Sequence, residues 1–205
     1  MTANPYDEVP YPSQPIEWTA PERLALASFL HGGPRPAIRT CRVLELGCGD
    51  GTNLLALARD RPAAYFMGVD GSARAIAAGE DRLRGSCVAN VTLRHADLLH
   101  ASSAIEGSFD YVIVHGVLSW VPDDVRDAIL QLAATRARPG GLVYLNYKMS
   151  SSSFAKQSAQ FEKHKNLVES QILGGGMLMK VAVPEGRAAD LGESNSDLKG
   201  RVQGR

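Results

Sequence analysis

Short apolar runs alternate with amphipathic stretches through the middle of the chain. Five runs are short enough, and rich enough in aliphatic and aromatic residues, to be strands: 42–46, 65–69, 91–95, 109–114 and 142–147. Apolar residues at helical spacing follow Thr52, Ser72 and Pro122. This alternation predicts an α/β fold, a Rossmann-like, doubly wound, mostly parallel sheet in three α/β/α layers.

The first 38 residues have a different pattern and are predicted to form an arm and one helix. Residues 1–18 contain four prolines, which favour an extended arm over a continuous helix. Thr19 and Glu22 have the spacing of a capping box, and Pro21 suits the first helical turn. We therefore expect a short helix that ends near Leu30.

The pattern weakens after residue 148, within a predicted domain that extends over residues 39–183. Residues 154–173 could form one amphipathic helix, and three glycines separate them from a candidate last strand at 177–183. This leaves open whether the C-terminal strand pair of the sheet is complete. Residues 184–205 are polar and rich in Gly, Ser and charge, so we expect a disordered tail.

Composition narrows the possible partners and the compartment. The chain has 22 basic and 22 acidic residues, so the net charge that a general nucleic-acid binder would carry is absent and nucleic acid is an unlikely partner. Three cysteines without CxxC spacing predict free thiols and no metal site. The polar N-terminus and the lack of a long apolar run predict a cytoplasmic protein without a membrane span.

A glycine-rich turn follows the first predicted strand, where a parallel sheet binds its ligands. Gly47, Gly49 and Gly51 permit a tight turn and a close approach of the backbone to a ligand. Asp70 ends the second strand, about twenty residues further on, where a carboxylate can accept hydrogen bonds from ribose hydroxyls. These features alone also fit a dinucleotide, and the glycines alone also fit a turn without a ligand.

Charge favours one ligand over the other. A dinucleotide site has the pattern GxGxxG and rests a pyrophosphate on a helix N-terminus, whereas Thr52 stands where the last glycine would be. Asp50 places a negative charge where the pyrophosphate would lie. A ligand with a sulfonium and an ammonium group tolerates carboxylates such as Glu45 and Asp50, which points to S-adenosylmethionine.

Four motifs in order resemble those of class I S-adenosylmethionine-dependent methyltransferases. They are Val43-Leu44-Glu45-Leu46-Gly47-Cys48-Gly49-Asp50-Gly51, Gly68-Val69-Asp70, His95-Ala96-Asp97-Leu98 and Pro139-Gly140-Gly141-Leu142. The resemblance implies that Asp70 holds the ribose and that Asp97 contacts the adenine amino group. It implies cofactor contacts from Glu45, Gly47, Cys48, Gly49, Asp50, Asn53, Asp70, Gly71, Ser72, Asp97, Leu98, His115 and Gly116.

A narrower resemblance concerns residues 6–13 and 115–122. Both segments are similar to methyltransferases with a downstream methyltransferase regulatory domain, among them bacterial protein-lysine methyltransferases. The implied function is methyl transfer to an acceptor that could be a protein lysine or a small molecule. The alternative is a non-catalytic binding or interaction module derived from a shortened methyltransferase. The sequence leaves the oligomeric state open.

No catalytic base is identified by the sequence. His115 is the best polar candidate near the transferred methyl group, and a structural or cofactor-contacting role is its alternative. Tyr6, Tyr11 and Trp120 are candidates for a lid or an acceptor pocket, and the alternative is ordinary packing.

Overall fold

The computed structural model describes residues 13–146, 169–173 and 177–181. Two short 3-10 turns are present, η1 (Glu17–Thr19) and η2 (Ala101–Ala104). The helices are α2 (Pro21–Leu30), α3 (Thr52–Arg59), α4 (Ala73–Arg84) and α5 (Asp123–Arg136). The strands are β1 (Arg42–Leu46), β2 (Tyr65–Asp70), β3 (Val91–His95), β4 (Phe109–Val114), β5 (Ala137–Leu145), β6 (Glu169–Leu173) and β7 (Met177–Val181).

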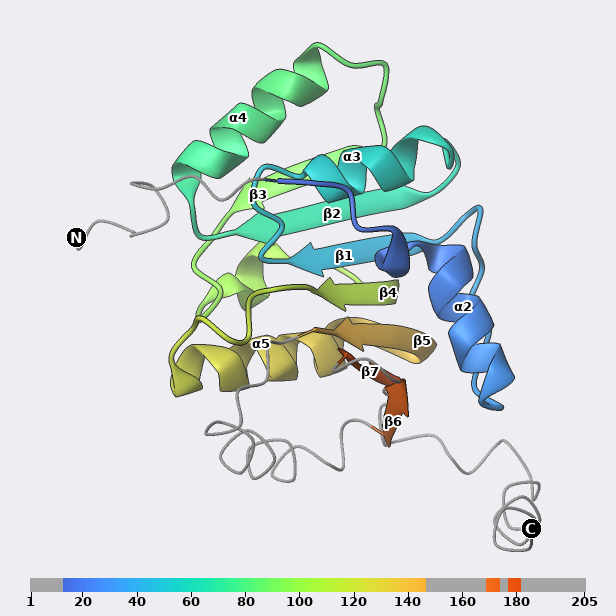
Figure 1. Cartoon of the computed structure of the whole chain (residues 1–205). Helices are drawn as coiled ribbons and strands as arrows, with labels where there is room; N and C mark the ends of the chain where they lie inside the picture. Colours follow the sequence, from blue (N-terminus) through green and yellow to red (C-terminus); the bar gives the residue numbers. More distant parts are fainter. Residues whose placement is uncertain (1–12, 147–168, 174–176, 182–205) are drawn as a thin grey trace, which may run out of the picture.

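The first five strands form one parallel sheet in the order β3-β2-β1-β4-β5 (Figure 1). The strand order reverses between β1 and β4, since the chain builds outward to β3 and then returns to the other side of β1. In open parallel sheets, ligands bind at the carboxyl ends of the strands beside such a switch point. The loops after β1, β2 and β4 therefore form the expected site.

Helices cover both faces of the sheet, which confirms the three-layer α/β/α prediction. On one face, Leu24, Leu54 and Ile76 from α2, α3 and α4 pack in one buried cluster with Val43 of β1. On the other face, residues of α5 and η2 pack in a second cluster with Leu44 and Leu46 of β1. Successive side chains of a strand point to opposite faces, so a strand buried on both sides is apolar throughout.

The helix α2 begins as Pro21 predicts, but the capping-box prediction for Thr19 is wrong. The N-cap residue is Ala20, and no side chain caps the helix. Thr19 is fully buried in η1, and its hydroxyl donates to the carbonyl oxygen of Ile16 at 2.8 Å. A hydroxyl directed into the interior cannot accept a hydrogen bond from the first turn of α2.

β5 begins at Ala137, five residues before the predicted start of the strand. Ala137 pairs with Phe109, the register then shifts, and pairing resumes at Leu142 opposite Tyr111. Gly140 adopts a φ of 75°, which lets the chain leave the ladder and rejoin it. The proline-glycine segment is thus an irregularity within the strand.

The helix prediction for residues 154–173 is wrong over Glu169–Leu173, which form β6. β6 pairs antiparallel with β7, whose strand prediction at Met177–Val181 is confirmed, and β7 lies against β5 (Figure 1). The two segments on either side of a glycine triplet satisfy each other's backbone groups, and this pairing outcompetes the weak helical pattern. The predictions for residues 1–12, 154–168 and 184–205 lie outside the described residues.

Candidate functional site

The loop between β1 and α3 is built on glycines in left-handed conformations. Gly47, Gly49 and Gly51 have φ angles of 75°, 56° and 71°. A Cβ atom on Gly47 would lie 2.2 Å from Cγ2 of Val117, a residue of the loop after β4. Gly47 also donates its N–H to the carbonyl oxygen of Val69 at 2.8 Å. The loop is therefore held close to both neighbouring strand ends, as a cofactor turn requires.

Asp70 joins this loop to the start of α4. Its Oδ2 accepts the N–H of Gly49 at 2.7 Å, and its Oδ1 accepts the N–H of Ser72 at 2.8 Å. Ser72 then caps α4 by accepting the N–H of Ala75 at 3.1 Å. Each carboxylate oxygen has a second lone pair, so both can still accept hydrogen bonds from a ligand.

Glu45 is a buried carboxyl with one satisfied and one unsatisfied oxygen. Oε1 accepts a hydrogen bond from Nδ2 of Asn53 at 3.0 Å, whereas Oε2 has no partner among the described residues. Burial raises the pKa of Glu45 to about 8, a shift that the Asn53 hydrogen bond opposes and the nearby charge of Asp70 increases. The side chain fits a site that is completed by a cation.

Asn53 is buried, and both ends of its amide have partners. Its Nδ2 donates to Glu45 and to Oγ1 of Thr19, the latter at 3.0 Å, while Oδ1 accepts the N–H of Ile16 at 2.9 Å. The predicted direct cofactor contact of Asn53 stays a prediction. Its hydrogen bond to Glu45 gives it an indirect effect on any ligand that Glu45 binds.

Asp50 forms an ion pair with Arg82, so the prediction that it presents a free negative charge to the ligand is wrong. One oxygen lies 2.8 Å from the guanidinium of Arg82, and the other accepts the N–H of Thr52 at 3.1 Å. Burial raises the pKa of Asp50, but hydrogen bonds from Arg82, Thr52 and Ser13 outweigh burial and bring it below its ordinary value. Asp50 is not a free charge that repels a pyrophosphate, so the preference for a cationic ligand rests on Glu45.

The residues after β3 lie at the rim of the same edge. The Asp97 side chain is largely exposed, its Oδ1 accepts the N–H of Leu99 at 3.0 Å, and its Oδ2 lies 3.4 Å from Nδ1 of His100. Nε2 of His95 lies 3.2 Å from the carbonyl oxygen of Gly71. The Leu98 side chain packs in the core, so its backbone is the part available to a ligand.

His115 in the loop after β4 stacks on Tyr144 of β5, a partner that the sequence did not indicate. The rings of His115 and Tyr144 stack with centroids 5.9 Å apart, and Nδ1 of His115 lies 3.2 Å from the Tyr144 hydroxyl. Burial lowers the pKa of His115, which is therefore neutral at pH 7. Burial raises the pKa of Tyr144 to about 12, against a hydrogen bond with the Asn146 side chain. Tyr144 was missed because it lies inside an apolar strand.

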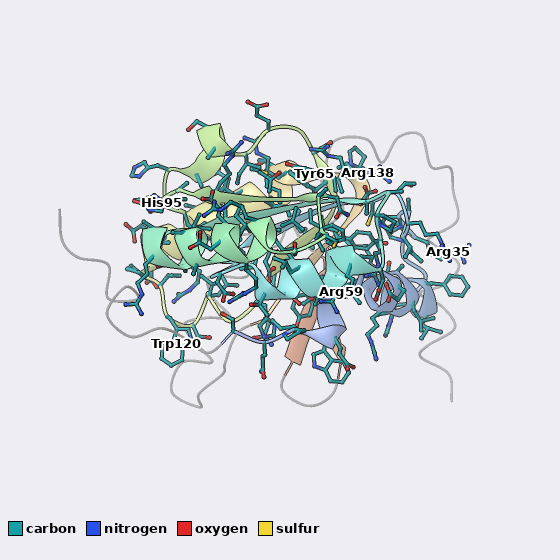
Figure 2. All side chains as sticks on the ribbon, turned by 90° about the horizontal axis from the view of Figure 1, so that it is seen from above. Arg35, Arg59, Tyr65, His95, Trp120 and Arg138 are labelled. Carbon is teal, nitrogen blue, oxygen red and sulfur yellow. The ribbon has the colours of Figure 1, made fainter. Side chains whose placement is uncertain are left out.

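The surface around Trp120 and Gly116, after β4, is exposed and loosely packed. Trp120 is 62% exposed, and no atom lies within 4 Å of a Cβ built on Gly116. Figure 2 shows Trp120 and His95 toward one end of the molecule and Arg35 at the other. Tyr6 and Tyr11 lie outside the described residues, so their predicted lid role stays a prediction.

Metal, thiol and membrane chemistry receive no support from the part of the chain that the structure describes. No group of three or more His, Cys, Asp or Glu side chains there could hold a metal ion. Cys41, Cys48 and Cys87 are free, and burial raises the pKa of Cys48, in the glycine-rich loop, well above its ordinary value. No helix in residues 13–146 is long and apolar enough to cross a bilayer.

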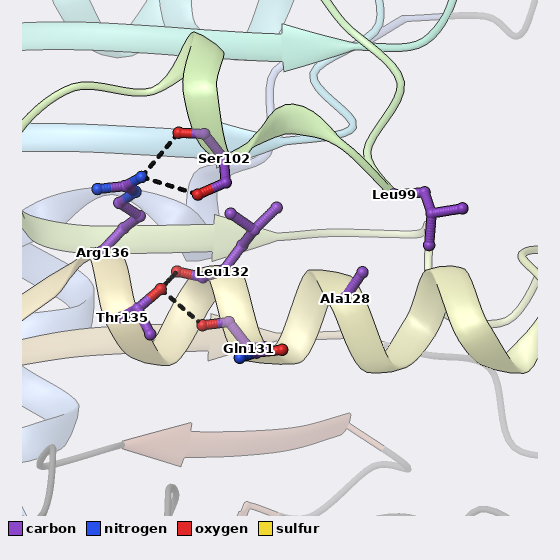
Figure 3. A pocket seen from close by; sticks show the side chains of 7 residues that line it. All are labelled: Leu99, Ser102, Ala128, Gln131, Leu132, Thr135 and Arg136. Carbon is purple, nitrogen blue, oxygen red and sulfur yellow. Dashed lines mark hydrogen bonds between the residues drawn. The ribbon is translucent and has the colours of Figure 1, made fainter.

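A separate hollow of about 350 Å³ lies between α5 and the segment around η2 (Figure 3). Arg136 donates there to the carbonyl oxygen of Ser102 at 2.7 Å. The other lining residues are Leu99, Ala128, Gln131, Leu132 and Thr135. None of the predicted cofactor residues lines this hollow.

Residues 43–141 match the profile of a family described as a methyltransferase domain, and their motifs are those that form the loops just described. Residues 43–141 of this chain form a class I methyltransferase domain. Among solved structures, the methyltransferase domain is similar to PKMT2 from Rickettsia typhi in complex with AdoHcy. The two are 32% identical with a TM-score of 0.66, over 73% of this chain and 29% of that one.

The similar curated proteins are longer than the segments of them that match this chain. An uncharacterized protein of Rickettsia prowazekii, RP028, is 36% identical over 69% of this chain and 56% of its own length. A second, RP789, is 38% identical over 70% of this chain and 26% of its own length. The trans-aconitate 2-methyltransferase of Deinococcus radiodurans is 34% identical over 50% of this chain and 36% of its own length. The chain thus spans from a quarter to about half of these relatives.

Proposed function

We propose that this chain binds S-adenosylmethionine at the carboxyl ends of β1, β2 and β3 and transfers its methyl group to a protein lysine. The observation that carries the proposal is the buried Glu45, whose unpartnered oxygen lies beside the glycine-rich loop and Asp70. The AdoHcy complex of PKMT2, 32% identical in sequence, supports the same cofactor.

Each part of the cofactor would contact residues that suit its charge and hydrogen-bonding groups. The backbone of Gly47 and Gly49 would line the methionine part, and Glu45 would face its ammonium group, where an opposite charge favours the ionised carboxylate. Asp70 would accept the ribose hydroxyls through its remaining lone pairs. Asp97, exposed at the rim, would accept the adenine amino group.

When bound, the cofactor supplies an electrophilic methyl group, and transfer is a direct displacement for which alignment can provide much of the acceleration. This chain's contribution is therefore to position the acceptor and to keep its nucleophile deprotonated. His115 is neutral and half-buried beside Tyr144, so it can accept a proton or orient an amine. We assign the acceptor side of the site to His115, Tyr144 and Trp120.

A protein lysine is favoured as the acceptor by two observations. PKMT2, which is a protein lysine methyltransferase, matches this chain in both sequence and structure. In addition, the acceptor side is open and carries an exposed indole, which can lie against the stem and ammonium group of a lysine. The trans-aconitate and tRNA methyltransferases match over about half of the chain.

The test is transfer of tritium from methyl-labelled S-adenosylmethionine to a set of lysine-containing proteins. Copies of the same proteins with acetylated lysines are the matched control, and trans-aconitate is assayed in parallel. Label that enters only the unmodified proteins supports a lysine acceptor. Label in trans-aconitate alone would replace lysine with a small molecule. Cofactor binding without transfer to any acceptor would favour the non-catalytic module.

A further inference from the structure

The segment that precedes α2 runs over the glycine-rich loop. Residues 13–19, which we call the strap, pass from this loop to η1 and then into α2 (Figure 1). At its start, Oγ of Ser13 would lie 3.9 Å from a Cβ on Gly49, and the Ser13 side chain hydrogen-bonds Asp50. At its end, Arg23 of α2 pairs with Glu17 at 3.2 Å and lies over the ring of Trp18.

The centre of the strap is fastened to α3 by buried hydrogen bonds. The N–H of Ile16 donates to Oδ1 of Asn53 at 2.9 Å, and Oγ1 of Thr19 accepts from Nδ2 of Asn53 at 3.0 Å. Thr19 is fully buried, and Asn53 is 5% exposed. Polar groups buried this deeply stay satisfied only while both segments remain in place.

These hydrogen bonds also fix which way the Asn53 amide faces. A backbone N–H can only donate, so Ile16 requires the oxygen of Asn53 on the strap side. The amide nitrogen is thereby directed to Oε1 of Glu45 at 3.0 Å. The same geometry leaves Oε2 of Glu45 as the oxygen without a partner.

We propose that Asn53 is a positioning residue that couples docking of the strap to the orientation of the Glu45 carboxyl, so that cofactor binding and strap docking stabilise each other. The inference rests on the proposed function, because it assigns Glu45 to the cofactor. With the strap detached, the Asn53 amide loses the partners that hold it, and Glu45 loses its fixed orientation. Coupling between two binding events is reciprocal, so the cofactor must also retain the strap.

The test measures S-adenosylhomocysteine affinity by calorimetry and hydrogen exchange at the Ile16 amide, using the full chain. We expect Thr19→Val and Asn53→Ala each to weaken binding about tenfold, within the usual range of coupling. In the wild type, S-adenosylhomocysteine should slow exchange at Ile16, and this effect should be absent in Asn53→Ala.

Two matched variants separate coupling from a general loss of stability. Asn90→Ala removes a half-buried amide, which donates to the carbonyl oxygens of Arg61 and Ala64 just before β2. Thr135→Val removes an exposed hydroxyl on α5. Both should keep wild-type affinity, even if Asn90→Ala lowers the melting temperature as much as Asn53→Ala does.

The outcomes distinguish this inference from the proposed function. Wild-type affinity in folded Thr19→Val and Asn53→Ala, or Ile16 exchange that ignores S-adenosylhomocysteine, overturns the coupling and leaves the cofactor assignment in place. A folded wild-type protein that does not bind S-adenosylhomocysteine overturns both. Weakened binding by Thr19→Val and Asn53→Ala, with unchanged affinity in the two controls, supports the coupling.

Discussion

The two halves of the carboxyl edge of the sheet are built differently. At β1 and β2, backbone and carboxylates are joined by short hydrogen bonds, such as that from Gly49 to Asp70 at 2.7 Å. At β4 and β5, the same edge has space beside Gly116, an exposed Trp120 and a half-buried His115. The first half is fixed by hydrogen bonds and the second is less tightly packed, which fits the proposed division into a cofactor side and an acceptor side. This division agrees with relatives whose names indicate different acceptors.

The largest effect is expected for Asp70→Asn. The amide retains the size of the side chain, but it removes the charge and one acceptor that serve the Gly49 and Ser72 N–H groups and, in the proposed site, the ribose. Losing hydrogen bonds to a charged group costs about 1.5–3 kcal/mol each, so S-adenosylhomocysteine affinity should fall about 100-fold. Calorimetry checks this, with Asp81→Asn, an exposed partner of Arg84, as the control.

A smaller effect separates two glycines with the same backbone conformation. Gly47→Ala and Gly116→Ala share the strain of a positive φ, at 75° and 72°. The new Cβ would meet Val117 at 2.2 Å in the first variant and no atom within 4 Å in the second. Gly47→Ala should therefore lose about 1–3 kcal/mol more stability and most of its cofactor affinity. Urea denaturation that gives equal losses for both would remove the distinction between the two halves.

The sequence predicted the local elements of the fold but not the contacts between distant segments. Periodicity located all five parallel strands and the glycine turn, because central strands such as β4, buried on both faces, leave a clear apolar run. Contacts between distant segments, such as Thr19 with Asn53, follow no local pattern and were missed. The ion pair of Asp50 was missed for the same reason, since its partner Arg82 lies in α4, beyond α3 and β2 in the chain.

Cofactor binding should release a proton from Glu45. In the free protein its pKa is about 8, so the carboxyl is mostly protonated at pH 7, and an adjacent ammonium group lowers that pKa. Affinity should therefore rise with pH up to about 8 and level off above it. Calorimetric titrations at pH 7 in phosphate and in Tris, which differ in ionisation enthalpy, measure the released proton. Glu45→Gln should abolish the buffer dependence, and its persistence in that variant would assign the proton to another group.

The smallest effect on cofactor binding is expected for Trp120→Ala. The indole is 62% exposed on the acceptor side, so its removal should leave S-adenosylhomocysteine affinity unchanged. The loss of a contact with a cation, about 0.5–1 kcal/mol at an exposed site, should raise the KM for a lysine acceptor severalfold. Steady-state kinetics check this. An equally large loss of S-adenosylhomocysteine affinity would assign Trp120 to the cofactor side instead of the acceptor side.

We propose the β1–β2 half of the edge as a site for S-adenosylmethionine and not for a dinucleotide. Calorimetric titration of the full chain with S-adenosylhomocysteine, and separately with NADH, tests it most directly. We expect micromolar binding of S-adenosylhomocysteine and no heat from NADH. Binding of NADH, or no binding of S-adenosylhomocysteine by a folded sample, would contradict it.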